Sequence, residues 1–163
     1  MEQIIIKNLS KSYGTLTVLK NVDLTLDRYK TYCLMSPSGT GKTTLFRILM
    51  GLEKADEGDI IWNVGSGAGT ETDTDASRSL RISAVFQEDR LCPQLTAVQN
   101  VTLVLPGSAE QYKEQIIKDF QQFGMDAAAL ALPAARLSGG QKRRTALLRA
   151  LWAASDTLLL DEP

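Results

Sequence analysis

The sequence predicts an α/β fold, and three patterns carry that prediction. Apolar and polar residues alternate over residues 22–26, at the two-residue period of a half-exposed strand in an antiparallel layer. An apolar run at residues 31–35 precedes a Ser/Pro/Gly loop, and apolar residues then recur at helical spacing over residues 45–49, which predicts strand, loop and helix in that order. The three leucines at residues 158–160 predict a fully buried strand.

The remaining elements follow from shorter signals. Residues 4–6, 60–62 and 81–86 are expected to form strands, while residues 63–79 are rich in Gly, Ser, Thr and Asp and are expected to be a surface insertion without an assigned function. Residues 141–154 predict one more helix.

The segment from about residue 89 to residue 136 is expected to be helical, and its clearest helix follows Ser108. Ser108 and Gln111 match a capping box, and Gly124 is expected to end the helix. Four apolar residues fall on one face of that helix at the helical period: Tyr112, Ile116, Phe120 and Phe123.

Composition limits the class of protein. A chain of 163 residues that is 44% hydrophobic and 23% charged is typical of one soluble globular domain. The net charge of -1 argues against non-specific nucleic-acid binding. Cys33 and Cys92 lie far apart, so neither a zinc site nor a disulfide framework is expected, and a reducing cytosol fits best. No apolar run approaches the roughly 18 residues of a membrane span, so a membrane role is expected only through partners.

Residues 36–44 carry the groups that a triphosphate needs. They match the Walker A pattern GxxxxGK(S/T) except at the first position, where Ser36 replaces glycine, and they read Ser36, Pro37, Ser38, Gly39, Thr40, Gly41, Lys42, Thr43 and Thr44. The glycines let backbone N–H groups converge, Lys42 can bridge the β- and γ-phosphates, and Thr43 can ligate Mg²⁺. The alternative is an ordinary Ser/Gly turn before a helix. Ser36 would cost about 1–2 kcal/mol only if this position required a positive φ.

A second motif lies near the end of the chain. The pentapeptide Leu137-Ser138-Gly139-Gly140-Gln141 resembles the signature of the ABC-type ATPases. In that family it opens a helix whose free N–H groups face the γ-phosphate of a nucleotide held by the other subunit of a dimer. Ser138 could instead simply cap the helix. For the basic run Lys142, Arg143 and Arg144 that follows, a solvated helix face is the favoured interpretation.

Other residues gain roles from this resemblance. Asp161, after the 158–160 run, matches the Walker B aspartate at Mg²⁺, and Glu162 matches the general base that activates water. A simple polar strand end is the alternative. Gln87 matches the Q-loop glutamine at the Mg²⁺ and water region, and Tyr13 matches the adenine-stacking aromatic. A packed turn tyrosine is the alternative for Tyr13.

The resemblance covers essentially the whole chain, with its motifs in family order. It implies a P-loop ABC ATPase domain over residues 1–163, with a β layer and P-loop core at 1–88, a helical subdomain at 89–136, and the signature helix and Walker B strand at 137–163. It implies ATP and Mg²⁺ as cofactors, a homodimer or paired ATPase subunit, and transmembrane permease subunits at the cytoplasmic face of the membrane. Residues 85–91 look like those of nitrate, sulfonate and taurine-type importers.

The family continues beyond Walker B with a D-loop, further strands and a switch histidine, whereas this sequence contains no histidine. We therefore expect a domain that is incomplete at its C-terminal side. Two functions are consistent with these features: the ATP-hydrolysing subunit of an importer, and a nucleotide-binding module that does not hydrolyse ATP. An ABC ATPase without a transport role is a third alternative.

Overall fold

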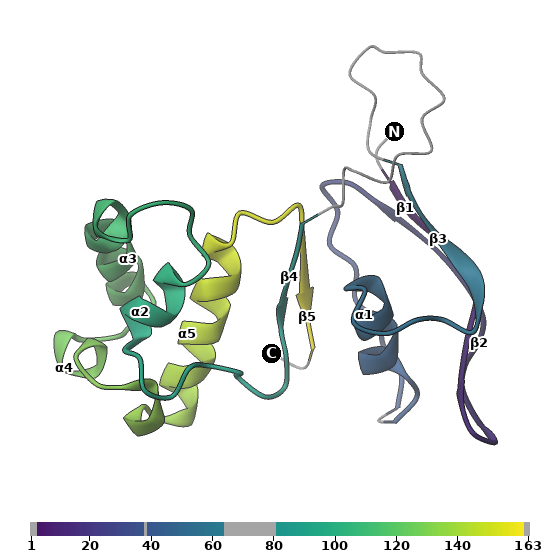
Figure 1. Ribbon diagram of the computed structural model, residues 1–163, viewed down its shortest axis with the longest axis horizontal. Helices are drawn as coiled ribbons and strands as arrows, with labels where there is room; N and C mark the ends of the chain where they lie inside the picture. The colour runs from purple at the N-terminus through teal and green to yellow at the C-terminus, as the bar shows by residue number, and fades with distance from the viewer. Residues whose placement is uncertain (1–2, 38, 64–80, 162–163) are drawn as a thin grey trace, which may run out of the picture. The chain divides into compact units, whose positions relative to one another are not determined.

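The computed structural model describes residues 3–37, 39–63 and 81–161 (Figure 1). The chain divides into two compact units, Met1–Ser79 and Leu80–Pro163, and each is described by itself. Ser38, Glu162 and the predicted insertion from residue 64 onward lie outside the described residues. No helix in the described ranges is long and apolar enough to cross a membrane.

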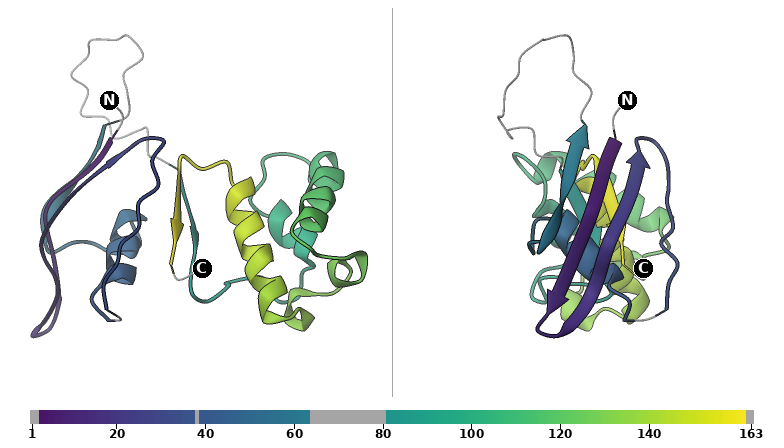
Figure 2. Two further views of the ribbon diagram at one scale, coloured as in Figure 1. Left: turned by 180° about the vertical axis from the view of Figure 1, so that it is seen from behind. Right: turned by 90° about the vertical axis from the view of Figure 1, so that its right-hand side faces the viewer.

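The first unit is built on a three-stranded antiparallel sheet. Its strands lie in the order β2 (Leu16–Asp27), β1 (Gln3–Tyr13) and β3 (Glu57–Asn63), and Ile4 of the central strand is paired with Leu26 on one side and Trp62 on the other. Helix α1 (Lys42–Leu49) lies over one face of the sheet (Figures 1 and 2). The predicted alternation in β2 is confirmed, because Asp23 and Thr25 are exposed between half-buried apolar residues. The buried side chains of this unit are Ile4, Ile6, Leu9, Leu19, Leu45, Ile48 and Leu49.

The strand expected at residues 31–35 is wrong. Residues 31–37 have no regular secondary structure and are exposed, with Met35 89% exposed. A strand needs a neighbouring backbone to satisfy its N–H and C=O groups, and no strand of the described residues is paired with this segment. The apolar pattern indicated a tendency to be buried, but it did not supply the pairing partner.

The second unit contains a two-stranded parallel sheet and the helices. Strands β4 (Ile82–Val85) and β5 (Thr157–Leu160) are paired in register from Ile82 and Thr157 to Val85 and Leu160. The helices are α2 (Ala97–Thr102), α3 (Glu110–Gln122), α4 (Ala127–Leu130) and α5 (Gly139–Trp152), with a 3₁₀ turn at Ala134–Arg136. In Figure 1 these helices lie on one side of the β4–β5 sheet.

Strand β5 was expected to be fully buried, and the position of the helices on one side of the sheet explains why it is not. The strand forms as expected, but it is not fully buried: Leu159 is 8% exposed, whereas Leu158 and Leu160 are 36% and 41% exposed. Successive side chains of a strand point to opposite faces of the sheet. Helix α5 packs against one face of this unit's sheet through Ala146 and Ala150, so among the described residues of this unit a helix covers one of the two leucine faces.

Helix α3 confirms the predicted apolar face but not the predicted cap. Ile116 and Phe120 are fully buried in the main cluster of this unit, with Tyr112 and Phe123 packed against it, and Gly124 follows the helix with φ +73°. The capping box at Ser108 is wrong, because the N-cap residue is Ala109 and no side chain caps the helix.

Candidate functional site

The phosphate loop joins the sheet of the first unit to helix α1. Gly39 and Gly41 have φ values of +80° and +94°, and Gly41 is the N-cap of α1 without any side-chain cap. A Cβ on Gly41 would lie 2.7 Å from Val18 Cγ1 and 2.9 Å from both Leu19 Cδ2 and the Val18 carbonyl oxygen. The backbone at this point therefore passes directly against β2, and α1 begins at this close contact with its positive dipole end toward the loop.

Side chains of the loop form a connected group. Lys42 Nζ donates to the carbonyl oxygens of Ser36 at 2.9 Å and Pro37 at 3.1 Å. Thr40 Oγ1 donates to the Pro37 carbonyl at 2.8 Å, so the Ser36 hydroxyl is left as the donor in its 2.5 Å contact with Thr40 Oγ1. Ser36 is not among the described residues with a positive φ. The serine therefore carries no left-handed strain, and its hydroxyl holds the loop where a glycine could not.

The ammonium of Lys42 is suited to an anion. It carries three donors, and the acceptors that the described residues give it are neutral: the carbonyl oxygens of Ser36 and Pro37 and, at 3.4 Å, the Ser36 hydroxyl. A phosphate oxygen is a stronger acceptor for a charged donor than a carbonyl oxygen is. The loop thus fits a phosphate chain on three counts: two glycines with left-handed backbone, an uncapped helix N-terminus and a charged donor.

Tyr13 lies near this loop in the same unit. It is the last residue of β1 and is paired with Leu16 of β2, while Val18, which packs against Gly41, follows two residues later on β2. Two residues along a strand span about 7 Å. Tyr13 is 47% exposed, so an aromatic ring is available close to the phosphate loop, as the stacking assignment requires.

Gln87 and Asp161 follow the ends of neighbouring strands in the second unit. Because β4 and β5 are parallel and in register up to Val85 and Leu160, both residues follow the carboxyl ends of neighbouring strands. The Asp161 N–H donates to the Val85 carbonyl at 2.9 Å, and Asp161 is buried, whereas Gln87 is exposed. This edge of a parallel sheet is where α/β proteins bind ligands.

The signature residues form the start of α5. Ser138 is the N-cap: its hydroxyl accepts from the Gln141 N–H at 3.3 Å, and the Gln141 side chain accepts from the Ser138 N–H at 2.9 Å. Gly139 and Gly140 are exposed. The capping interpretation of Ser138 is thus confirmed, and it leaves the glycine backbone accessible for the role that the resemblance implies.

Two arginines of α5 hold the segment that contains Gln87. Arg143 donates to the carbonyls of Phe86 at 2.5 Å and Gln87 at 3.1 Å, and lies 3.7 Å from Asp89 Oδ1. Arg149 donates to the carbonyls of Arg90 at 2.9 Å and Asp89 at 3.3 Å.

The solvated face expected for residues 142–144 is therefore wrong for Arg143. Burial lowers the pKa of Arg149 from its ordinary value, yet an arginine keeps its charge in proteins. Contacts of this kind join segments far apart in the chain, so no local sequence pattern indicated them.

Comparisons with known proteins agree with this arrangement. Residues 19–163 match the model of the ABC transporter family. The chain is 37% identical over 170 residues to the sulfate/thiosulfate import ATP-binding protein CysA of Halalkalibacterium halodurans, covering 98% of this chain and 45% of that protein. It is 39% identical over 160 residues to the aliphatic sulfonates import ATP-binding protein SsuB 3 of Pseudomonas savastanoi pv. phaseolicola, covering 98% and 55%. The chain thus spans about half the length of these curated relatives.

A solved structure extends the similarity to three dimensions. The ATP-binding cassette MJ0796, a dimer in a post-hydrolysis state bound to ADP and Pi, matches with a TM-score of 0.80 and 30% identity, over 98% of this chain and 74% of that one. The predicted ABC ATPase fold, with its antiparallel layer, parallel strands and helical part, is confirmed. This chain belongs to the ABC transporter family of ATP-binding domains.

Proposed function

We propose that this chain is the ATP-binding and ATP-hydrolysing part of an importer subunit, in which ATP closes a dimer and so drives a transmembrane permease at the cytoplasmic face of the membrane. The observation that carries the proposal is the phosphate loop, where Gly41 is pressed against β2 and Lys42 is held at the start of α1. The names of the relatives support sulfur oxyanions, such as sulfate or sulfonates, as the class of cargo.

In this proposal the first unit binds the nucleotide. The N–H groups at the start of α1 and the ammonium of Lys42 hold the phosphates, and Tyr13 stacks on the adenine. Thr43, Gln87 and Asp161 would hold Mg²⁺, whose charge offsets that of the phosphates. The buried position of Asp161 at the end of β5 suits a fixed carboxylate ligand.

The second unit supplies the remaining roles. Glu162 takes the proton from the attacking water, and Gln87 orients that water. Ser138, Gly139, Gly140 and Gln141 face the nucleotide of a partner subunit, which is a second copy or a paired ATPase. Gly139 and Gly140 offer their N–H groups to it, while the N–H groups of Ser138 and Gln141 are used in the capping box that holds the start of α5. Residues 1–163 then act as one ABC domain, with the P-loop core at 1–88, the helical subdomain at 89–136 and the signature and Walker B segments at 137–163.

Two measurements test the proposal. Calorimetric titration of the chain with Mg²⁺-ATP should give saturable binding that Lys42→Ala weakens at least tenfold, because the charged donor is lost. Lys113→Ala serves as a matched control, since Lys113 is exposed on α3, where it pairs with the exposed Glu110. Equal binding by the Lys42 variant would count against the phosphate loop.

The base is tested in the full-length subunit assembled with its permease. Glu162→Gln should keep ATP binding and abolish phosphate release. Tight ATP binding by the wild-type assembly without any turnover would instead establish the binding module and overturn the enzymatic proposal.

A further inference from the structure

Glu53, in the turn between α1 and β3, contacts Tyr13, whose ring lies beside the phosphate loop. Glu53 has no part in the proposed binding of nucleotide or Mg²⁺. Its Oε1 accepts a hydrogen bond from the Tyr13 hydroxyl. Its Oε2 lies 3.3 Å from Arg47 Nε, and Lys11 Nζ lies 3.9 Å from Oε1. The Glu53 side chain is only 16% exposed. Both carboxylate oxygens are therefore engaged.

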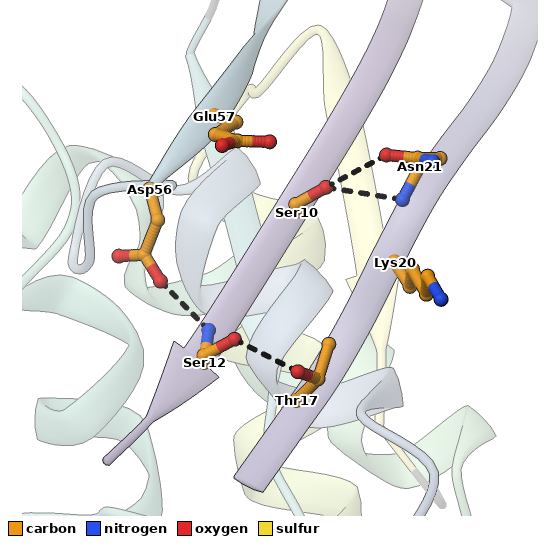
Figure 3. Close-up of a pocket in the computed structure, with 7 residues that line it drawn as sticks. All are labelled: Ser10, Ser12, Thr17, Lys20, Asn21, Asp56 and Glu57. Carbon is orange, nitrogen blue, oxygen red and sulfur yellow. Dashed lines mark hydrogen bonds between the residues drawn. The ribbon is translucent and has the colours of Figure 1, made fainter. Parts of the chain in front are cut away.

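Lys11 fixes the same ring from another direction. Its ammonium lies 5.5 Å from the centre of the Tyr13 ring, within the range of a cation–π interaction. Asp56 accepts from this ammonium at 2.8 Å and from the Ser12 N–H at 2.7 Å (Figure 3), so the lysine is itself anchored. The ring is thus held at its hydroxyl end by Glu53 and by Lys11 over the ring, and Tyr13 is still 47% exposed.

We propose that Glu53 is a positioning residue that orients Tyr13 to stack on the purine of a nucleotide whose phosphates lie in the phosphate loop. The inference rests on the proposed nucleotide binding. Stacking requires a defined ring plane, and a side chain already held in that plane loses less rotamer freedom when the base binds. Because the charges of Arg47 and Lys11 offset those of Glu53 and Asp56, the carboxylate can hold the hydroxyl without placing net negative charge near the phosphates.

If Glu53 acts through Tyr13, its removal should weaken the binding of the base and leave the binding of the phosphates unchanged. We would measure the affinity of the full chain for ATP and for inorganic tripolyphosphate, which has no base. Glu53→Ala and Tyr13→Phe should each weaken ATP binding three- to tenfold while changing tripolyphosphate affinity by less than twofold. The double variant should be no weaker than the worse single variant, since both changes remove the same hydrogen bond. Glu53→Gln, which keeps an acceptor oxygen, should fall between Glu53→Ala and the wild type.

Glu57→Ala is the matched control. Figure 3 shows Glu57 one residue beyond Asp56, with no dashed contact to the other residues drawn, and its removal should change neither affinity. Equal loss of ATP and tripolyphosphate affinity in Glu53→Ala would overturn the proposal, because the phosphate loop itself would then be disturbed. Unchanged ATP affinity in both Glu53→Ala and Tyr13→Phe would overturn it as well. If the wild-type chain bound neither ligand, the proposed function and this role would both fail. Binding of both ligands with no effect of the variants would remove this role alone.

Discussion

Comparing Gly41→Ala with Gly39→Ala should distinguish two costs of a side chain in the phosphate loop: the cost of a steric clash and the cost of a left-handed backbone. Alanine at φ +94° costs about 1–2 kcal/mol, because L residues avoid this region. The new methyl would also lie 2.7 Å from Val18 Cγ1 and 2.9 Å from the Val18 carbonyl oxygen. A side chain can rotate away, but the carbonyl belongs to the paired strand β2, so relief requires the loop to move. Overpacking of this kind adds about 1–3 kcal/mol, which gives a total of about 2–5 kcal/mol.

Gly39→Ala is the control within the same loop. Gly39 also has a positive φ, of +80°, yet a Cβ there would meet nothing within 4 Å, so only the conformational cost of about 1–2 kcal/mol applies. Urea denaturation followed by circular dichroism measures both free energies of unfolding, and titration with ATP reports the loop. We expect Gly41→Ala to be less stable than Gly39→Ala by about 1–3 kcal/mol and to bind ATP more weakly. Equal destabilisation by the two variants would refute the steric argument.

Two further predictions concern stability. Asn100→Leu should lower the free energy of unfolding by about 2–4 kcal/mol. The buried Asn100 amide oxygen accepts from the Cys92 N–H at 2.8 Å, and that donor would lose this partner. Thr102→Val on the same helix is the control, and a loss below about 0.5 kcal/mol in Asn100→Leu would contradict the reasoning. The hydrogen bond from Lys11, followed by that from the Ser12 N–H, holds the pKa of Asp56 below its ordinary value of 3.8. The folded-state pKa is thus below the unfolded one, so this contribution to stability is present above about pH 4 and is lost as the pH falls through the lowered pKa. Asp56→Asn should flatten that part of the acid unfolding profile, and an unchanged profile would argue against the contact.

The sequence was most informative where a local pattern determines the structure. Alternation in β2, the apolar face of α3 and the pairing of Ser138 with Gln141 at the start of α5 all depend on residues close together in the chain, and the structure confirms them. The cap of α3 failed although it is also local: the helix begins one residue later than Ser108 would require.

Other features depend on distant segments, and the sequence could not supply them. Residues 31–35 carry a strand-like pattern, yet strand formation depends on a partner that the pattern does not name. Arg143 belonged to a run of cations typical of a solvated face, and only the fold brought it to the carbonyls of Phe86 and Gln87. Glu53 is equally inconspicuous, because its contact with Tyr13 spans 40 residues of the chain.

The hold of Arg143 and Arg149 on segment 86–90 has a mechanical consequence. Four main-chain carbonyls of that segment accept from guanidinium groups of one helix, and each charge-assisted bond is worth on the order of 1 kcal/mol or more. The segment cannot slide along α5 without losing several of these bonds together. The main chain around Gln87 is therefore tied, through Arg143 and Arg149, to the same helix that begins at Ser138.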